Sequence, residues 1–393
     1  MIAIFGNRVH DSTRCAIGCI FLIFKFKQYD NMNALLGVLF HFLGGFSSGS
    51  FYLPYKKVKG WQWETFWLIG GTFSWIIVPP LAAFLTIPDF WEIIKNESSS
   101  ILGLTFLFGA LWGIGGFMYG LGVRYLGVAL GSSIMLGLTM VIGSLVPSIY
   151  YEFSPQIGKD NIGLMASSSW GQFVLLGLFI CVIGIIISGK AGVMKDKELQ
   201  SESVDPHGTS VKTEYKFGLG LTVAIISGVL SACFNFGLEA GKPMALVANE
   251  AWKIANPNQG EFLFQNNVTY IVVLWGGMAS NLIGCLYLSF KNKSYTDYTK
   301  KNVPVVKNII FCALAGTMWF LQFFFYGMGE SKMGNGPSSW ILHMAFIILI
   351  ANLWGVIIKE WKGVSRKTIS TIVVGMLVMF ISILIVGYGN SLR

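Results

Sequence analysis

Charged residues are scarce in this chain. Only 12% of its 393 residues are Asp, Glu, Lys or Arg, well below the ~25% typical of water-soluble proteins, while 54% are hydrophobic. A chain with so few polar side chains cannot cover a folded surface in water, which excludes an ordinary soluble domain. We therefore predict an all-α integral membrane protein, because in lipid each backbone N–H and C=O must find its partner within its own helix.

Motifs of common catalytic and metal sites are also missing. The sequence contains no HExxH, GxSxG or GxxxxGK[ST] motif and no paired carboxylates. Its six cysteines form no CxxC, and four of them lie inside apolar runs. We therefore expect buried thiols, no metal and no cofactor. These absences argue against an enzyme and against a transporter that carries its own ATPase.

Basic residues exceed acidic ones by 28 to 19, which gives a net charge of +9. They lie in short segments between apolar runs rather than on one continuous face. We interpret them as signals of membrane orientation, and we expect no nucleic-acid partner.

Ten apolar stretches are long enough to cross a bilayer as helices. They cover approximately residues 34–53, 66–87, 101–120, 127–150, 170–189, 217–238, 268–290, 308–328, 337–358 and 368–388. The odd-numbered loops between them hold 18 Lys and Arg residues, and the even-numbered loops hold five. Because positively charged loops stay in the cytoplasm, both termini are predicted to face outward.

Residues 1–31 do not fit this scheme. The apolar run around CIFLIF (19–24) is too short to span a bilayer, and no small-residue cleavage site follows it. We interpret residues 1–31 as a non-native N-terminal extension and Met32 as the start. A signal peptide is the alternative interpretation.

The sequence also contains an internal repeat. Segment 111–127 aligns with segment 318–334 at an offset of 207 residues, and three glycines coincide. The other matched residues are Trp112 with Trp319, Phe117 with Phe324, Tyr119 with Tyr326 and Ser132 with Ser339. A weaker match relates 44–52 to 228–236.

This repeat divides the chain into two halves of five helices each. The first repeat covers 32–189, a mobile cytoplasmic linker covers 190–216, and the second repeat covers 217–393. An odd number of spans inverts the second half in the membrane, so the fold class is ten transmembrane helices in two inverted five-helix repeats. Inverted repeats with a site at their interface are a transporter architecture.

Several segments resemble the L-rhamnose–proton symporter family of the drug/metabolite transporter superfamily. They are HFLGG, FYLPYKKVKGWQWET, LFGALWGIGG, YGLGVRYLG, KPM (242–244), WFLQFFFYG, SSWILHM and KEW (359–361). The resemblance implies a bacterial inner-membrane protein of ten helices that imports L-rhamnose together with a proton. The outward-facing termini predicted from the loop charges would then be periplasmic. The segment GMGESKMGNGPSS (327–339), with Glu330 and Lys332, departs from the family pattern, as does Glu239.

A sugar needs hydrogen-bond donors and acceptors, and aromatic rings against its C–H groups. Trp and Tyr residues and an amide in the third, eighth and ninth spans supply these groups. The candidate substrate-binding residues are Trp112, Tyr119, Trp319, Gln322, Tyr326 and Trp340. The alternative is that these aromatic residues only anchor helices at the membrane surface.

Proton coupling needs a group that gains and loses a proton. His41 and His343 are the only histidines inside the predicted spans, and Glu239 lies near the end of the sixth span. These three residues are the candidates. Glu239 is alternatively an interfacial carboxylate paired with Lys242, and Arg124 is a candidate for gating or substrate binding that alternatively contacts lipid phosphates.

The function expected from all this is secondary active import of a small sugar with the proton as coupling ion. The alternative within transport is a uniporter or exporter of another small metabolite, which would move its substrate without pH dependence.

Overall fold

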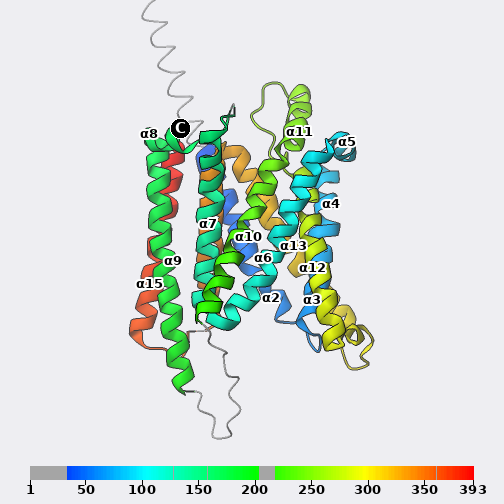
Figure 1. Ribbon diagram of the computed structural model, residues 1–393, viewed down its shortest axis with the longest axis vertical. Helices are drawn as coiled ribbons and strands as arrows, with labels where there is room; N and C mark the ends of the chain where they lie inside the picture. Colours follow the sequence, from blue (N-terminus) through cyan, green and yellow to red (C-terminus); the bar gives the residue numbers. More distant parts are fainter. Residues whose placement is uncertain (1–32, 127, 157, 203–216, 360) are drawn as a thin grey trace, which may run out of the picture.

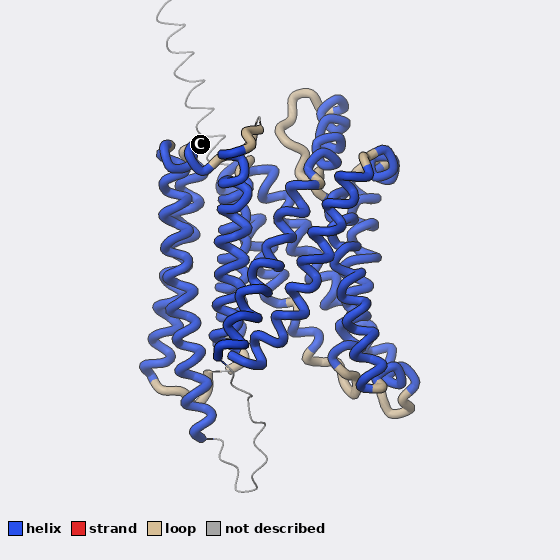
Figure 2. The backbone as a smooth tube through the Cα atoms, viewed as in Figure 1, coloured by secondary structure: helices blue, strands red, loops and turns tan. Residues whose placement is uncertain are grey.

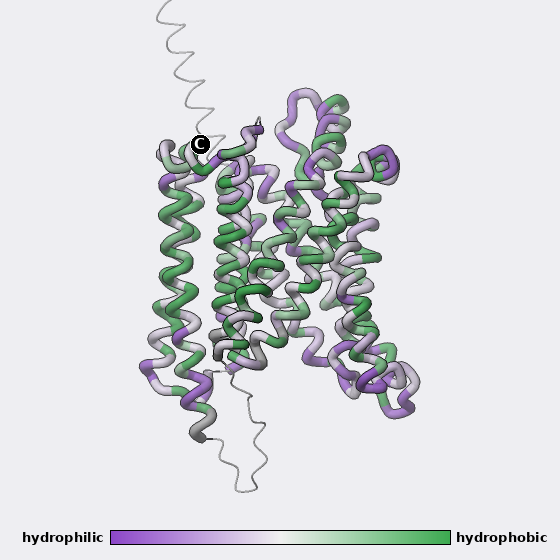
Figure 3. Tube along the Cα trace, viewed as in Figure 1, coloured by the Kyte–Doolittle hydropathy of each residue, from purple (hydrophilic) through white to green (hydrophobic). Residues whose placement is uncertain are grey.

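The computed structural model describes residues 33–126, 128–156, 158–202, 217–359 and 361–393. The helices of this described part are joined by loops, and it contains no strand (Figure 2). Ten of its helices are long and apolar enough to cross a membrane, as predicted. Their apolar residues form a band across the middle of the bundle, and hydrophilic residues gather at both ends (Figure 3). The chain is therefore a multi-pass membrane protein.

The spans agree with the predicted stretches, and most differ by only a few residues at each end. The first span covers Asn33–Tyr55 and includes α2 (Tyr52–Tyr55), and the second, Trp63–Thr86, joins α3 (Trp63–Gly71), η1 (Thr72–Ile77) and α4 (Val78–Thr86). The others are α6 (Ser99–Leu126), α7 (Val128–Phe153), α9 (Ser169–Glu202), α10 (Phe217–Ala240), α12 (Asn267–Asn292), α13 (Val305–Met333), α14 (Gly336–Ile357) and α15 (Arg366–Ser391). Short helices between spans are α5 (Phe90–Asn96), α8 (Ile162–Ser167), α11 (Lys242–Ala255) and η2 (Ser294–Thr299).

The linker differs from its prediction, because α9 continues well past residue 189 and ends at Glu202. The sequence KDKELQ in this extension consists mostly of good helix formers. Glu198 also accepts hydrogen bonds from the Ser365 backbone N–H (2.6 Å) and the Thr368 hydroxyl (2.7 Å) at the start of α15. The rest of the predicted linker, 203–216, lies outside the described residues.

The second span remains helical through Pro79 and Pro80, although proline commonly ends or kinks a helix. The adjustment takes the form of a π-helix, η1, directly before these prolines. Proline has no N–H to donate to the preceding turn, so a local change in hydrogen bonding is expected there. The wide turn carries Ser74 and Trp75, which are both buried inside the bundle.

The helices pack through small residues. At one side of the bundle α9 and α15 lie side by side (Figure 1), and a methyl group at Gly184 would come within 2.6 Å of the Met379 side chain. In the other part α6 packs between α10 and α12, where a methyl group at Gly276 would come within 2.0 Å of the Phe106 carbonyl oxygen. Close packing of this kind is typical of membrane helices.

The connections divide between the two ends of the bundle. α5, α8, α11 and the C-terminus lie at one end, and the connections 56–62 and 293–304 lie at the other (Figure 1). At the latter end the buried Asp297 carboxylate of η2 accepts from the Gln62 N–H (2.7 Å) and the Thr65 hydroxyl (2.8 Å), which fastens η2 to the start of the second span.

Candidate functional site

Three side chains from three helices form the histidine cluster: His41 of the first span, Tyr326 of α13 and His343 of α14. The ring centroids of His41 and His343 are 6.1 Å apart, and Tyr326 lies 5.5 Å from His41 and 5.1 Å from His343. All three are buried, with exposures of 0%, 2% and 2%.

Two glycines let the helices come close enough to form this cluster. A methyl group at Gly44 would lie 3.1 Å from the His343 ring and 2.9 Å from the backbone carbonyl oxygen of Gln322. A methyl group at Gly329 would lie 2.7 Å from Nε2 of His41. These two glycines therefore allow the two imidazoles to lie close to each other.

The histidine cluster has unused hydrogen-bonding capacity. Both ring nitrogens of His41 and both of His343 are buried and have no hydrogen-bond partner among the described residues. Buried polar atoms are nearly always paired, so each exception needs an explanation, and a chemical task is one of them. These imidazoles can exchange a proton with water or bond to a hydroxyl once the site opens.

Three indoles form a second group, the tryptophan cluster: Trp75, Trp112 and Trp319. The ring centroids of Trp112 and Trp319 are 5.4 Å apart, and Trp75 lies 6.3 Å from Trp112 and 5.6 Å from Trp319. The sequence predicted Trp112 and Trp319 as site residues but did not single out Trp75.

Phe234 of α10 connects the two clusters. Its ring lies 5.2 Å from Trp112 and 6.4 Å from Trp340, and the Trp340 ring lies 6.0 Å from Tyr326. The Trp340 indole donates to the Thr139 carbonyl oxygen (3.0 Å), which fixes its orientation. Four predicted aromatic residues, Trp112, Trp319, Tyr326 and Trp340, thus belong to one continuous aromatic core, together with the predicted His41 and His343.

Gln322 lies in this core as well. It is 4% exposed, and its side-chain amide donates to the Trp319 carbonyl oxygen at 2.9 Å. The amide therefore lies inside the bundle beside the tryptophan cluster, where lipid does not reach it.

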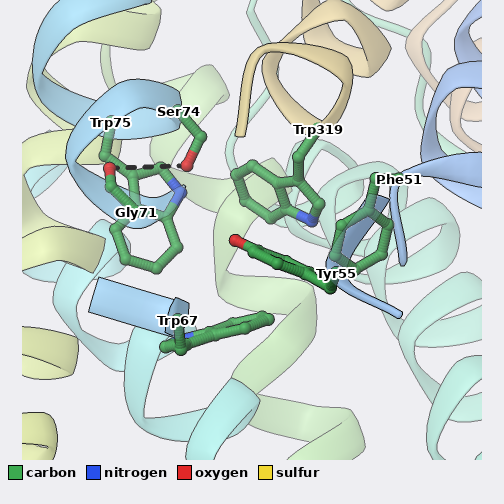
Figure 4. A pocket seen from close by; sticks show the side chains of 7 residues that line it. All are labelled: Phe51, Tyr55, Trp67, Gly71, Ser74, Trp75 and Trp319. Carbon is green, nitrogen blue, oxygen red and sulfur yellow. Dashed lines mark hydrogen bonds between the residues drawn. The ribbon is translucent and has the colours of Figure 1, made fainter. Parts of the chain in front are cut away.

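A small pocket lies beside the tryptophan cluster, and Trp75 and Trp319 belong to both. Figure 4 shows its seven lining residues, of which the sequence predicted only Trp319. They are Phe51, Tyr55, Trp67, Gly71, Ser74, Trp75 and Trp319. Phe51 and Tyr55 end the first span and Trp67 is near the start of the second, so the pocket lies toward the end of the bundle that carries connection 56–62. The dipeptide Pro79–Pro80 is a sequence signal that could have pointed to an irregular helix at this place.

Two predicted residues make their contacts elsewhere. The Tyr119 hydroxyl shares a 2.6 Å hydrogen bond with the Ser132 hydroxyl, and its ring packs on a small separate core with Leu126 and Met135. Glu239, at the end of α10, pairs with Lys159 and accepts from the Tyr151 hydroxyl at 2.7 Å. Arg124 belongs to α6, but its side chain lies outside what the structure describes.

The predicted alternative pairing of Glu239 with Lys242 is wrong. Lys242 pairs with Glu330 at 3.1 Å, and Asn266 donates to the same carboxylate at 2.6 Å. Burial alone would lower the pKa of Lys242, but attraction to Glu330 and Glu239 outweighs it and raises the pKa above its usual value. Glu330 follows Tyr326 by one helical turn, so this ion pair lies at the C-terminal end of α13, near the histidine cluster.

The comparisons with known proteins agree with the resemblance noted in the sequence. The family model of the L-rhamnose-proton symport protein (RhaT) matches residues 30–392, a range that contains all ten spans. The chain belongs to this family. The L-rhamnose-proton symporter of Yersinia pestis (strain Pestoides F) is 35% identical over 366 residues, 92% of this chain and 99% of that protein. That of Cronobacter sakazakii (strain ATCC BAA-894) is 33% identical over 365 residues, 91% of this chain and 98% of that protein.

Membership of the L-rhamnose-proton symport family classes the protein as a transporter rather than an enzyme. It also gives the two clusters a chemical context. A symporter needs one place that binds its solute and one that binds and releases a proton, and the clusters offer groups suited to each.

Proposed function

We propose that this protein imports L-rhamnose together with protons across a bacterial inner membrane. Family membership and relatives named L-rhamnose-proton symporter over 92% of the chain support this function. We also assign it, on the resemblance, to the drug/metabolite transporter superfamily. The excess of basic residues in connections such as 56–62 and 293–304 supports a cytoplasmic position for that end of the bundle and a periplasmic position for the termini.

The observation that carries proton coupling is the histidine cluster with its four unpartnered ring nitrogens. No carboxylate contacts either imidazole within the described residues, so a proton bound in this packed state would be a buried charge without a counterion. Protonation therefore disfavours the packed state and favours one in which water or substrate reaches His41 and His343. This links proton binding to a change of conformation.

The sugar is proposed to bind among the predicted aromatic and amide groups beside these histidines. Trp112, Trp319 and Trp340 offer ring faces, and Gln322 and Tyr326 offer polar atoms. Since Tyr326 contacts both His41 and His343, a sugar bound there would also affect the proton site. Coupling requires that sugar and proton each strengthen the binding of the other.

The repeat supports a mechanism of alternating access. Residues 32–189 and 217–393 are proposed to form two inverted halves that rock around the clusters. The contact between Trp112 and Trp319 supports this view, because residues that an inverted repeat relates meet each other only near its axis. Tyr119, Glu239 and Arg124 remain predicted site residues, and the first two would contribute in a different conformation.

The decisive experiment uses the purified protein in lipid vesicles with a weakly buffered medium. Adding L-rhamnose outside should make the external medium more alkaline, and a protonophore or protein-free vesicles should abolish the signal. L-rhamnose uptake without a pH change would contradict symport and favour the uniporter alternative. Absence of uptake would contradict the proposed substrate.

A further inference from the structure

Two pairs of hydroxyl groups that the sequence repeat relates are in different states in this structure. Tyr119 and Ser132 align with Tyr326 and Ser339 at the 207-residue offset. The hydroxyls of Tyr119 and Ser132 share a 2.6 Å hydrogen bond that joins α6 to α7. The Ser339 hydroxyl is 0% exposed and has no hydrogen-bond partner among the described residues, so it makes no such bond to Tyr326. One pair is therefore closed and its counterpart is open.

The two pairs lie at matching places near opposite ends of the bundle. Tyr119 lies about two helical turns before the end of α6, and Tyr326 lies about two turns before the end of α13. The connection from α13 to α14 is beside the C-terminus, where Arg393 donates to the Gly334 carbonyl oxygen at 2.7 Å. The α5 helix, which lies at that same end, precedes α6, so α6 ends at the other end (Figure 1).

The unpaired hydroxyl of Ser339 requires an explanation. A serine inside a helix often donates to the carbonyl oxygen one turn earlier, as Ser144 does to Met140 at 2.8 Å. Ser339 makes no bond of this kind among the described residues, and an unpaired buried hydroxyl is unfavourable. Ser339 precedes His343 by about one turn of α14, and the Tyr326 ring lies 5.1 Å from the His343 ring. A small movement of α13 against α14 could therefore supply Tyr326 as its partner.

The proposed alternating access gives the open pair a role. If the two halves are inverted repeats, an exchange of conformation between them turns a site that faces one side of the membrane toward the other. A contact that is closed in one repeat here would then open, and its counterpart would close.

We propose that Ser339 is a positioning residue for Tyr326. In the opposite-facing conformation the hydroxyls of Tyr326 and Ser339 share a hydrogen bond, and the bond between Tyr119 and Ser132 is broken. Tyr326 contacts both His41 and His343, so the exchange of bonds changes the surroundings of the proposed proton site. This inference rests on the alternating access of the proposed function.

Hydrogen exchange of the purified protein in detergent, followed by mass spectrometry, tests the proposal. Ser132→Ala removes the closed pair and should shift the population toward the opposite-facing conformation. Amides in residues 339–346 of α14 should then exchange roughly fivefold more slowly, because the bond from Tyr326 to Ser339 forms there. A purely local role of Ser132 would not protect amides near the other end of the bundle.

Ser144→Ala is the matched control on the same helix. Ser144 is 1% exposed, and its hydroxyl bonds only to backbone carbonyl oxygens of α7, so its loss should leave exchange in residues 339–346 within about twofold of the parent. Tyr119→Phe removes the same bond as Ser132→Ala from the other partner, and it should slow the same amides. This second variant keeps the test valid if Ser132→Ala does not fold.

The double variant Ser132→Ala/Ser339→Ala identifies the new partner. Its exchange in residues 339–346 should be no slower than that of the parent, because the bond from Tyr326 to Ser339 cannot form. The proposal is wrong if neither Ser132→Ala nor Tyr119→Phe slows these amides, or if the slowing persists in the double variant. The measurement uses no sugar, so its failure would leave the proposed import of L-rhamnose to be judged by the vesicle experiment.

Discussion

The indoles of Trp112 and Trp319 contact each other at the centre of the bundle, with centroids 5.4 Å apart and planes inclined by 31°. The two residues lie on α6 and α13 and align with each other at the 207-residue offset of the sequence repeat. Their contact thus joins the two proposed repeats through equivalent residues.

A double-mutant cycle should detect this contact. Replacing Trp112 and Trp319 by Leu, singly and together, should give a coupling of about 0.5–1.5 kcal/mol in the free energy of unfolding, measured in detergent. The pair Trp112 and Trp252 is the control, because Trp252 packs in a separate core. Additive effects for Trp112 and Trp319 would mean that their contact contributes nothing.

The histidine cluster should carry the proton. We expect His343→Gln and His41→Gln each to abolish the L-rhamnose-dependent pH change in vesicles while sugar exchange across the membrane continues. His207→Gln is the control, since His207 lies outside the predicted spans. Full proton coupling in both cluster variants would contradict our assignment.

The ion pair between Lys242 and Glu330 should stabilise the C-terminal end of α13. Glu330→Gln removes the partner of a largely enclosed ammonium group, and should lower the free energy of unfolding by about 1.5–3 kcal/mol. Adding Lys242→Met should recover part of this loss, because the uncompensated charge is gone.

A surface pair provides the comparison for that measurement. Glu92 pairs with Lys95, and both side chains are more than half exposed. Glu92→Gln should therefore change the free energy of unfolding by less than ~1 kcal/mol. Equal losses for Glu92→Gln and Glu330→Gln would show that the enclosure of Lys242 has no energetic consequence.

Asp297 should make stability depend on pH. Burial alone would raise the pKa of its carboxyl, but hydrogen bonds from Lys300, the Gln62 N–H and Thr65 outweigh it and lower the pKa below 3.8. The pKa of this carboxyl is therefore lower in the folded protein than in the unfolded chain. Its ionised form stabilises the fold fully at a pH above the pKa of the unfolded chain, and this stabilisation is lost as the pH falls through the pKa of the folded protein.

Asp297→Asn tests whether the Asp297 carboxylate makes the protein less stable as the pH falls. The substitution should lower the Tm at pH 7, and the difference from the parent should shrink as the pH falls below about 4. Asp89→Asn, at an exposed position, serves as the control. A difference that stays constant from neutral to acidic pH would contradict the assignment.

The contact of α9 with α15 should not tolerate a larger residue. A methyl group at Gly375 would lie 2.4 Å from the Ser188 hydroxyl oxygen and 2.9 Å from the Ser188 backbone nitrogen. Gly375→Val should therefore cost about 1–3 kcal/mol through overpacking. Gly103→Val on α6, where nothing lies within 4 Å, should cost less, and melting of the two variants in detergent compares them. Equal losses would mean that helix propensity alone is responsible.

The sequence by itself determined the class of protein, the ten spans, the family and most residues of the two clusters. These follow from local properties of the sequence. An apolar run long enough to cross the bilayer must be helical, and a polar residue inside such a run must have a hydrogen-bonding partner or a functional role. His41, Gln322, Tyr326 and His343 could be selected for this reason alone.

Only the tertiary structure decided which of these residues meet. Phe234 and Trp75 are ordinary aromatic residues in apolar runs, yet one connects the clusters and the other lines the pocket. The partners of Glu239 and Lys242 likewise come from residues about 80 or more positions away, Lys159 and Glu330. Contacts between helices depend on how closely glycines such as Gly44 and Gly329 let two helices approach, and on which face of each helix is turned toward its neighbour. Neither can be predicted from a local sequence pattern.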